Sequence, residues 1–180
     1  MRNQIAFENL LRIEDPNLIK KTINHVLRAV GTRYASKNLS KCAKTKALVH
    51  NFNFLSKFEG GPKGFLKYIS EIENEKQRIG YVKKNLRYLQ NKGARDFLME
   101  LGLVRNSIAI DSRIQTILNK MGIEIPIDSL GNPTLYDKIQ TELLEKVCKP
   151  LKISGIEFYS IQWHEQRRNN KRHHLLIQNL

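Results

Sequence analysis

The chain has 180 residues, 41% of them apolar, which is enough to bury the core of one compact domain or of two small lobes. Its formal net charge of +14 indicates an anionic partner, with nucleic acid as the first candidate and an acidic membrane surface as the second. The two cysteines, Cys42 and Cys148, exclude a four-cysteine zinc or iron–sulfur site and are expected to be free thiols, and no apolar run approaches the roughly 20 residues of a membrane-spanning helix.

The first half of the chain shows helical periodicity almost throughout. Helices are predicted over residues 7–13, 14–30, 36–58, 64–73 and 75–89. The second of them has a typical start, with Asp15 as its cap and Pro16 in the first turn, and Gly31 is expected to end it. The third is expected to end before the pair Gly60 and Gly61.

The second half continues the helical pattern after a tight turn at residues 90–93. Phe97 and Leu98 lie on the apolar face of the helix that follows this turn. Further helices are predicted over residues 111–122, 134–151 and 155–168, with a loop over 123–133 and a basic tail over 167–180. Asp111 or Ser112 is expected to cap the first of these helices. Because no internal repeat and no series of strands is apparent, the predicted fold class is all-α.

Positive charge gathers around the turn at residues 90–93. The basic residues there are Lys83, Lys84, Arg87, Lys92 and Arg95. Backbone N–H groups at the start of a helix bind phosphate well, so the turn suits a nucleic-acid backbone. Two simpler interpretations stay open at this point: Lys92 also fits a solvated lysine of a basic protein, and Asp111 also fits a helix cap.

Residues from about 80 to 120 resemble the helix–hairpin–helix DNA glycosylase superfamily, most of all its small archaeal members that excise 8-oxoguanine. In those enzymes a hairpin lysine precedes a small residue by two positions, an apolar helix follows, and an aspartate heads the next helix. Lys92-Gly93-Ala94, the run DFLMELG and the run AIDSRI match these parts in the same order. Farther on, EFYSIQWHEQ is similar to the closing helix of the small members, which carries a tryptophan.

The resemblance implies an all-α, helix-hairpin-helix glycosylase-like fold with two helical lobes flanking a cleft. It implies one such unit over residues 1–180, with its core motif at about 80–120 and a basic tail at 167–180. The activity it implies is that of a bifunctional glycosylase and AP lyase that removes oxidised guanine from double-stranded DNA and nicks the strand by β-elimination. No cofactor and no metal ion are expected, since the histidines near the end have no carboxylate or cysteine at ligand spacing.

The hairpin departs from the family pattern at its glycines. The family hairpin usually reads Leu-Pro-Gly-hydrophobic-Gly before the lysine, whereas the residues here are Leu86, Arg87, Tyr88, Leu89 and Gln90. Both glycines are missing, and Gly93 would replace them only if the hairpin were shifted along the chain.

Lys92 and Asp111 are the predicted catalytic residues. An ionised Asp111 would stabilise the positive charge that develops on the sugar when an N-glycosidic bond breaks, and the helix that it heads favours its charged form. Lys92 would attack the anomeric carbon and form a Schiff base, for which its amine must first lose a proton. The neighbouring charges of Lys84, Arg87 and Arg95 are expected to favour the neutral amine.

Other residues are expected to bind the base or the backbone. Trp163 and Phe158 are the predicted substrate-binding aromatics, with Phe52, Phe54 and Tyr68 as further candidates, and a core role fits each of the five better than a stacking role does. The predicted DNA-binding residues are Lys84, Arg87, Asn91, Gly93 and Arg95. Further phosphate contacts, or else a solvated face, are expected on the third helix at Lys37, Lys41, Lys44 and Lys46.

Two alternatives to a bifunctional enzyme remain. The first is a monofunctional glycosylase that uses Asp111 and water, and the second is a non-catalytic helical module that binds DNA or RNA. For all three we expect a monomer that does not enter a membrane. No signal-peptide pattern precedes the first helix, so the expected location is the cytoplasm, in association with the nucleoid if the source is prokaryotic.

Overall fold

The structure is a computed structural model that describes residues 6–33, 35–120 and 122–162. Helices form its architecture and these residues contain no strand, so the predicted all-α class is confirmed. The chain divides into two compact units, Met1–Gln90 and Asn91–Leu180, which we call the N-terminal and C-terminal units. The division falls within the stretch that resembles the glycosylases. Each unit is described by itself.

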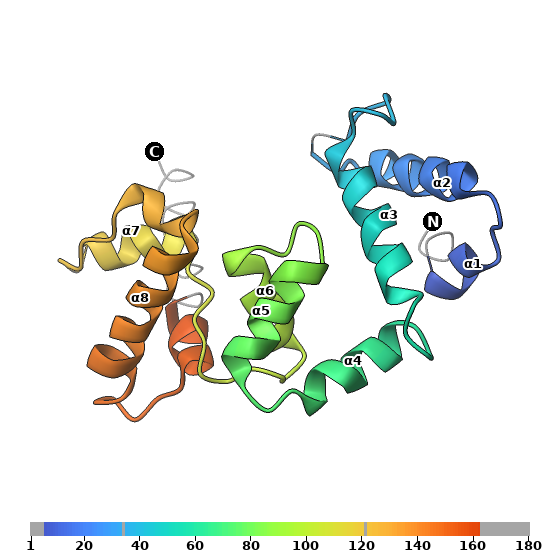
Figure 1. Cartoon of the computed structure of the whole chain (residues 1–180). Coiled ribbons are helices and arrows are strands. Elements are labelled where there is room, and N and C mark those ends of the chain that lie inside the picture. The colour runs from blue at the N-terminus through green and yellow to red at the C-terminus, as the bar shows by residue number, and fades with distance from the viewer. Residues whose placement is uncertain (1–5, 34, 121, 163–180) are drawn as a thin grey trace, which may run out of the picture. The chain divides into compact units, whose positions relative to one another are not determined.

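The N-terminal unit consists of five helices within its described residues (Figure 1). They are α1 (Phe7–Leu11), α2 (Pro16–Ala29), α3 (Ala43–Leu55), α4 (Pro62–Glu71) and α5 (Glu75–Asn85). As predicted, the Asp15 side chain caps α2 by accepting a hydrogen bond from the N–H of Asn17 at 2.8 Å. The core where α1, α2 and α3 meet contains Leu10, Ile19, Ile23 and Phe52.

Five aromatic rings pack together around α3, α4 and α5. Neighbouring centroids lie 5.1–6.4 Å apart, in tilted or edge-to-face arrangements that suit aromatic pairs. The rings belong to Phe54, Phe58, Phe65, Tyr68 and Tyr81. Phe54 and Tyr68 therefore pack against other rings of the unit, although Tyr68 stays 43% exposed, and Phe52 is buried in the neighbouring core.

Helix α3 begins at Ala43, seven residues later than expected. The residues before it form a loop, 30–42, whose polar side chains bond to the backbone instead of allowing a helix. The Oδ1 atom of Asn38 accepts hydrogen bonds from the N–H groups of Ser40 and Lys41, at 3.0 and 3.3 Å. Of the four lysines assigned to this helix, Lys37 and Lys41 therefore lie in the loop.

The C-terminal unit is also helical (Figure 1). Its elements are α6 (Asn91–Glu100), α7 (Ser112–Lys120), the 3-10 turn η2 (Ile127–Leu130), α8 (Pro133–Leu143), the π-helical turn η3 (Leu144–Cys148) and helical residues 155–162. The predicted loop at 123–133 thus contains a turn of 3-10 helix, and the predicted helix over 134–151 changes to π-helix at Leu144. The core includes Ile108, Ile110, Ile114, Leu118, Tyr136, Leu143, Cys148 and Phe158.

Candidate active site

The turn at residues 86–90 contains a left-handed residue that is not glycine. Tyr88 has a φ of 68°, a conformation that strains an ordinary residue by about 1 kcal/mol. Asn51 of α3 holds the preceding residue from both sides. Its Oδ1 atom accepts a hydrogen bond from the N–H of Arg87 at 2.7 Å, and its Nδ2 atom donates to the Arg87 carbonyl at 3.1 Å. The fixed backbone thus keeps Tyr88 in this conformation.

Two of the five predicted phosphate contacts are accessible side chains on the N-terminal unit. Lys84 lies in the last turn of α5 and Arg87 in the turn that follows, and both are exposed. Gly93, in the first turn of α6, is half-buried. Asn91 is buried, and its Nδ2 atom donates to the carbonyl of Leu130 at 3.2 Å. Its side chain is therefore packed inside the C-terminal unit and not presented to solvent, unlike those of Lys84 and Arg87.

Arg95, the fifth of these predicted contacts, is also buried, with a side chain that is only 3% exposed. Its guanidinium donates to Gln140 Oε1 at 2.6 Å, to Asp137 Oδ1 at 2.5 Å and to the Asn91 carbonyl at 2.7 Å. It also lies 4.4 Å from the centre of the Tyr136 ring, in a cation–π contact. Arg95 therefore joins α6 to α8, and its guanidinium is buried between them instead of facing the solvent, where a DNA phosphate would lie.

The same network fixes the segment that leads to Asp111. Gln140 Oε1 also accepts hydrogen bonds from Ser107 Oγ at 2.9 Å and from the N–H of Ile108 at 3.2 Å. The Tyr136 hydroxyl bonds to the Ile110 carbonyl at 3.1 Å. One buried polar network thus positions the backbone near both catalytic candidates. It bonds to α6, which carries Lys92, and to the extended segment at residues 107–110, which leads to Asp111.

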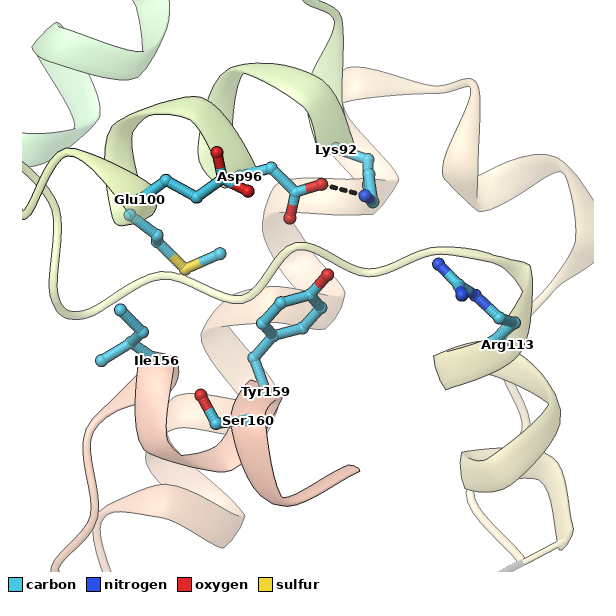
Figure 2. Close-up of a pocket in the computed structure, with 8 residues that line it drawn as sticks. Lys92, Asp96, Glu100, Arg113, Ile156, Tyr159 and Ser160 are labelled. Atoms are coloured by element: carbon cyan, nitrogen blue, oxygen red, sulfur yellow. Dashed lines mark hydrogen bonds and ion pairs between the residues drawn. The ribbon is translucent and has the colours of Figure 1, made fainter. Parts of the chain in front are cut away.

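A pocket of about 380 Å³ opens beside the first turns of α6 (Figure 2). Its lining residues are Lys92, Asp96, Met99, Glu100, Arg113, Ile156, Tyr159 and Ser160. Pockets of this size hold small organic groups, and this one combines apolar walls with a few charged side chains, as ligand pockets usually do. Figure 2 shows α6 contributing one wall, α7 the Arg113 side chain, and helical residues 155–162 the Tyr159 ring.

Lys92 is half-buried in the first turn of α6 and faces this pocket. Its Nζ atom donates a hydrogen bond to the carboxylate of Asp96, one helical turn farther on (Figure 2). Glu100 follows after one more turn on the same face of the helix and also lines the pocket. A primary amine therefore stands at the wall of a pocket with two carboxylates beside it.

Asp111 caps α7, as the sequence predicts. Its Oδ1 atom accepts hydrogen bonds from the N–H groups of Arg113 and Ile114, at 3.0 and 3.1 Å, and its Oδ2 atom accepts from the Arg113 guanidinium at 2.7 and 3.0 Å. Burial acts to raise the pKa of Asp111, but these hydrogen bonds outweigh burial and hold the pKa below its ordinary value. The carboxylate is therefore ionised at neutral pH.

Asp111 does not itself line the pocket; its ion-pair partner Arg113 does. Asp111 also affects Tyr159. Burial is the main cause that raises the pKa of the Tyr159 hydroxyl, and the negative charge of Asp111 raises it further. Lys92 thus lines the pocket itself, whereas Asp111 is connected to the pocket only by its ion pair with Arg113. Each of them forms an ion pair of its own.

The closing helix contributes a residue that the sequence reasoning missed. The ring of Phe158, a predicted substrate-binding residue, is 5% exposed and belongs to the core with Ile110 and Tyr136, and it does not line the pocket. Tyr159, one position on, turns into the pocket instead. Gly155 allows the start of this helix to pack closely against Ser107, since a Cβ atom at position 155 would lie 2.5 Å from the Ser107 carbonyl oxygen. Trp163, the other predicted substrate-binding residue, and the basic tail lie outside the described residues.

Helical spacing alone could have found Asp96 and Glu100, because they follow Lys92 at intervals of four residues. The relevant clue for Tyr159 is the rotation of about 100° per residue, which turns it away from a buried Phe158. No local signal pointed to Arg113, since its contact with Asp111 depends on the geometry of the helix start.

Within the described residues, no three His, Cys, Asp or Glu side chains come together as metal ligands, and no helix is long and apolar enough to cross a membrane. Cys42 and Cys148 are both free and buried. In comparisons with known proteins, no family model, no curated protein and no solved structure matches the chain significantly.

Proposed function

We propose that the protein is a DNA N-glycosylase with AP lyase activity that acts on oxidised guanine through Lys92. The observation that carries the proposal is the placement of the Lys92 amine in the wall of a pocket of about 380 Å³, beside the Asp96 carboxylate and the Tyr159 ring. An amine nucleophile, a hydrogen-bonded carboxylate and an aromatic wall are the groups that excision of an unstacked base through a Schiff base requires.

The turn at residues 86–90 supports the proposal. In the family pattern a glycine stands where this chain has Tyr88, and Tyr88 has the positive φ of 68° that glycine adopts readily. Leu86, which stands where the family pattern has its leucine, is buried. The path of the backbone therefore fits a hairpin of this kind although its glycines are replaced.

In the proposed reaction the Lys92 ammonium first loses a proton to water, and Asp96 positions the nitrogen by accepting a hydrogen bond from it. The neutral amine then bonds to the anomeric carbon of the sugar while the bond to the base breaks, and the base leaves with that electron pair and takes up a proton. Opening of the sugar ring gives the Schiff base. Loss of a proton from the adjacent carbon then expels the 3′ phosphate, which nicks the strand.

Asp111 stabilises the positive charge on the sugar in this scheme. Its lowered pKa provides the ionised form, but Arg113 holds the carboxylate in the structure. Arg113 lines the pocket and is 42% exposed, so the guanidinium can turn to a DNA phosphate and release one carboxylate oxygen toward the sugar.

The test is borohydride trapping on duplex oligonucleotides that contain 8-oxoguanine, with an undamaged duplex as the control. The parent protein is expected to form a covalent adduct and a nicked strand, and Lys92→Gln is expected to form neither. Lys120→Gln provides a matched control, since it removes a lysine charge from an exposed site outside the predicted catalytic and DNA-binding residues. Equal nicking by Lys92→Gln and by the parent would contradict the assignment.

The same assay separates the two alternative functions. Release of the base without a trapped adduct would support a monofunctional enzyme that activates water beside Asp111. Salt-sensitive binding with no base release on a panel of damaged duplexes would support a non-catalytic DNA-binding module.

A further inference from the structure

The N-terminal unit holds most of the positive charge of the protein. Met1–Gln90 contain 18 lysines and arginines against 7 acidic residues, a net charge of +11, whereas Asn91–Leu180 contain 13 against 10, a net charge of +3. The imbalance is concentrated further, because no Asp or Glu occurs between Pro16 and Phe58. Nine basic residues lie in that stretch: Lys20, Lys21, Arg28, Arg33, Lys37, Lys41, Lys44, Lys46 and Lys57.

Three of these lysines lie within ten residues of one another along the chain, in the loop before α3 and in the first turn of that helix. Lys37 and Lys41 extend from the loop and Lys46 from the helix, and all three side chains are exposed. None of them forms an ion pair within the described residues, and the nearest acidic residues along the chain are Asp15 and Glu59. Their charges are therefore uncompensated by local carboxylates.

The loop that carries these lysines is fixed by buried polar contacts. Asn24 is 4% exposed, and its Nδ2 atom donates to the Ser36 carbonyl at 3.0 Å and to Thr45 Oγ1 at 2.9 Å. Lys44 Nζ donates to the Arg33 carbonyl at 2.5 Å. Burying an amide costs free energy unless it is hydrogen-bonded, and here the amide's bonds go to the loop. The backbone at Arg33 and Ser36 is thus tied to α2 and α3.

The composition of the loop favours a nucleic-acid backbone over a lipid surface. Its other exposed side chains include Asn38 and Ser40; the Ser40 hydroxyl donates to Asn38 Oδ1 at 2.6 Å, which leaves the Asn38 amide N–H groups to donate to phosphate oxygens. A membrane-surface site needs a continuous apolar face to insert beside its basic residues. Of the exposed apolar residues, Val30 lies at the start of the loop, and Leu48 lines an apolar pocket of about 190 Å³ on α1, α2 and α3, so binding to vesicles is measured beside binding to DNA.

We propose that Lys37, Lys41 and Lys46 form a phosphate-binding surface that holds a nucleic-acid backbone without reading its bases. It is separate from the pocket in the C-terminal unit and supplies affinity for undamaged duplex. Each phosphate that a lysine neutralises releases condensed counterions, so each contact adds about 0.9 to the slope of log affinity against log salt concentration.

The experiment compares two triple variants of the full chain by fluorescence anisotropy on an undamaged duplex at several salt concentrations. Lys37→Gln/Lys41→Gln/Lys46→Gln removes the proposed surface. Lys120→Gln/Lys138→Gln/Lys152→Gln removes the same charge from exposed lysines of the C-terminal unit. We expect the first variant to bind at least tenfold more weakly at about 0.1 M salt and to lose roughly 2.7 from the salt slope, and the control to change both far less.

Equal losses in the two variants, or no loss in either, would overturn the proposal. Thermal unfolding of both variants at the parent temperature excludes a folding defect, and the exposure of all six side chains makes that result the expected one. Vesicles of phosphatidylcholine with and without phosphatidylserine provide the second arm. A first variant that lost vesicle binding and kept DNA affinity would also overturn the proposal, in favour of a lipid surface.

This test is independent of the glycosylase proposal, because it measures binding of undamaged DNA. If trapping fails and the first variant still loses DNA affinity, the surface stands without the enzyme. If trapping succeeds and both triple variants bind alike, the enzyme stands without the surface.

Discussion

At the scale of single residues, the two catalytic candidates share one feature: each carries its own counter-ion. Lys92 bonds to Asp96 one turn away, and Asp111 bonds to the Arg113 guanidinium. The first pair is half-exposed and contributes only tenths of a kcal/mol to folding. The second also includes two backbone N–H groups, so it has a larger structural part. A test of Asp111 must therefore separate its effect on stability from its effect on chemistry.

Replacement of Asp111 by Asn should lower the free energy of unfolding by about 1 kcal/mol at pH 7, because Asn still caps α7 but loses the charged bonds with Arg113. The native pKa of Asp111 is lowered, so its charge stabilises the fold above the ordinary carboxyl pKa near ~4, and this contribution disappears as the pH falls through the native pKa. Urea unfolding at neutral and acid pH measures the difference between parent and variant. A difference that persists undiminished at about pH 2 would contradict the ion-pair account.

Tyr88 offers a second residue-scale test. Gly relieves the strain of a positive φ but gains freedom in the unfolded chain, so Tyr88→Gly should change the free energy of unfolding by no more than about 1 kcal/mol, in the stabilising direction. Tyr88→Val should lower it by about 1 kcal/mol or more, since a β-branched residue avoids this region most strongly. Chemical denaturation gives the order of the three proteins. A valine variant more stable than the glycine variant would show that the turn relaxes away from φ of 68°.

At the scale of elements, Arg95 shows why a basic residue near a phosphate-binding turn need not bind phosphate. Its partners Asp137 and Gln140 lie more than 40 residues away along the chain, on α8. No periodicity within α6 indicates that a helix from elsewhere will cover this side chain. The sequence therefore predicts the helix and its charge, and only the packing of α8 decides where that charge points.

Arg95→Met should lower the free energy of unfolding by about 3 kcal/mol, because it leaves the Asp137 carboxylate and the Gln140 amide without their buried donor. Lys84→Gln is the matched exposed control and should stay within about 0.5 kcal/mol of the parent. Denaturant unfolding of both variants checks the prediction. A stable Arg95→Met protein would mean that α6 and α8 pack without this network.

Local signals predicted the helices well where they were strong. Asp15 and Pro16 mark the start of α2, and Asp111 marks the start of α7. The start of α3 was misplaced because the bonds that hold the loop before it come from Asn24, on another helix. At the site, the spacing of Lys92 and Asp96 was visible in the sequence, whereas the entry of the Tyr159 ring into the pocket depends on how helical residues 155–162 pack against the extended segment.

At the scale of the whole molecule, chemistry and affinity are assigned to different parts of the chain. The proposed catalytic groups belong to the nearly neutral C-terminal unit, and the uncompensated lysines belong to the N-terminal unit. A change at the pocket should therefore leave general DNA binding intact. This separation follows from the charge distribution and does not depend on the damaged base that the pocket accepts.

Lys92→Gln accordingly should bind an undamaged duplex within about twofold of the parent and show the same salt slope, since it removes one charge of a net +14 and that charge is already paired with Asp96. Anisotropy titrations at several salt concentrations measure both quantities. A large drop in affinity would place Lys92 among the principal phosphate contacts and weaken its assignment as a nucleophile.

The two hydrogen bonds between the Asn51 side chain and Arg87 involve only main-chain atoms of Arg87, its N–H and its carbonyl. Substitution of Arg87 by any residue that keeps its backbone N–H, which excludes only proline, thus leaves both bonds in place, and the course of the bend does not depend on the side chain at that position.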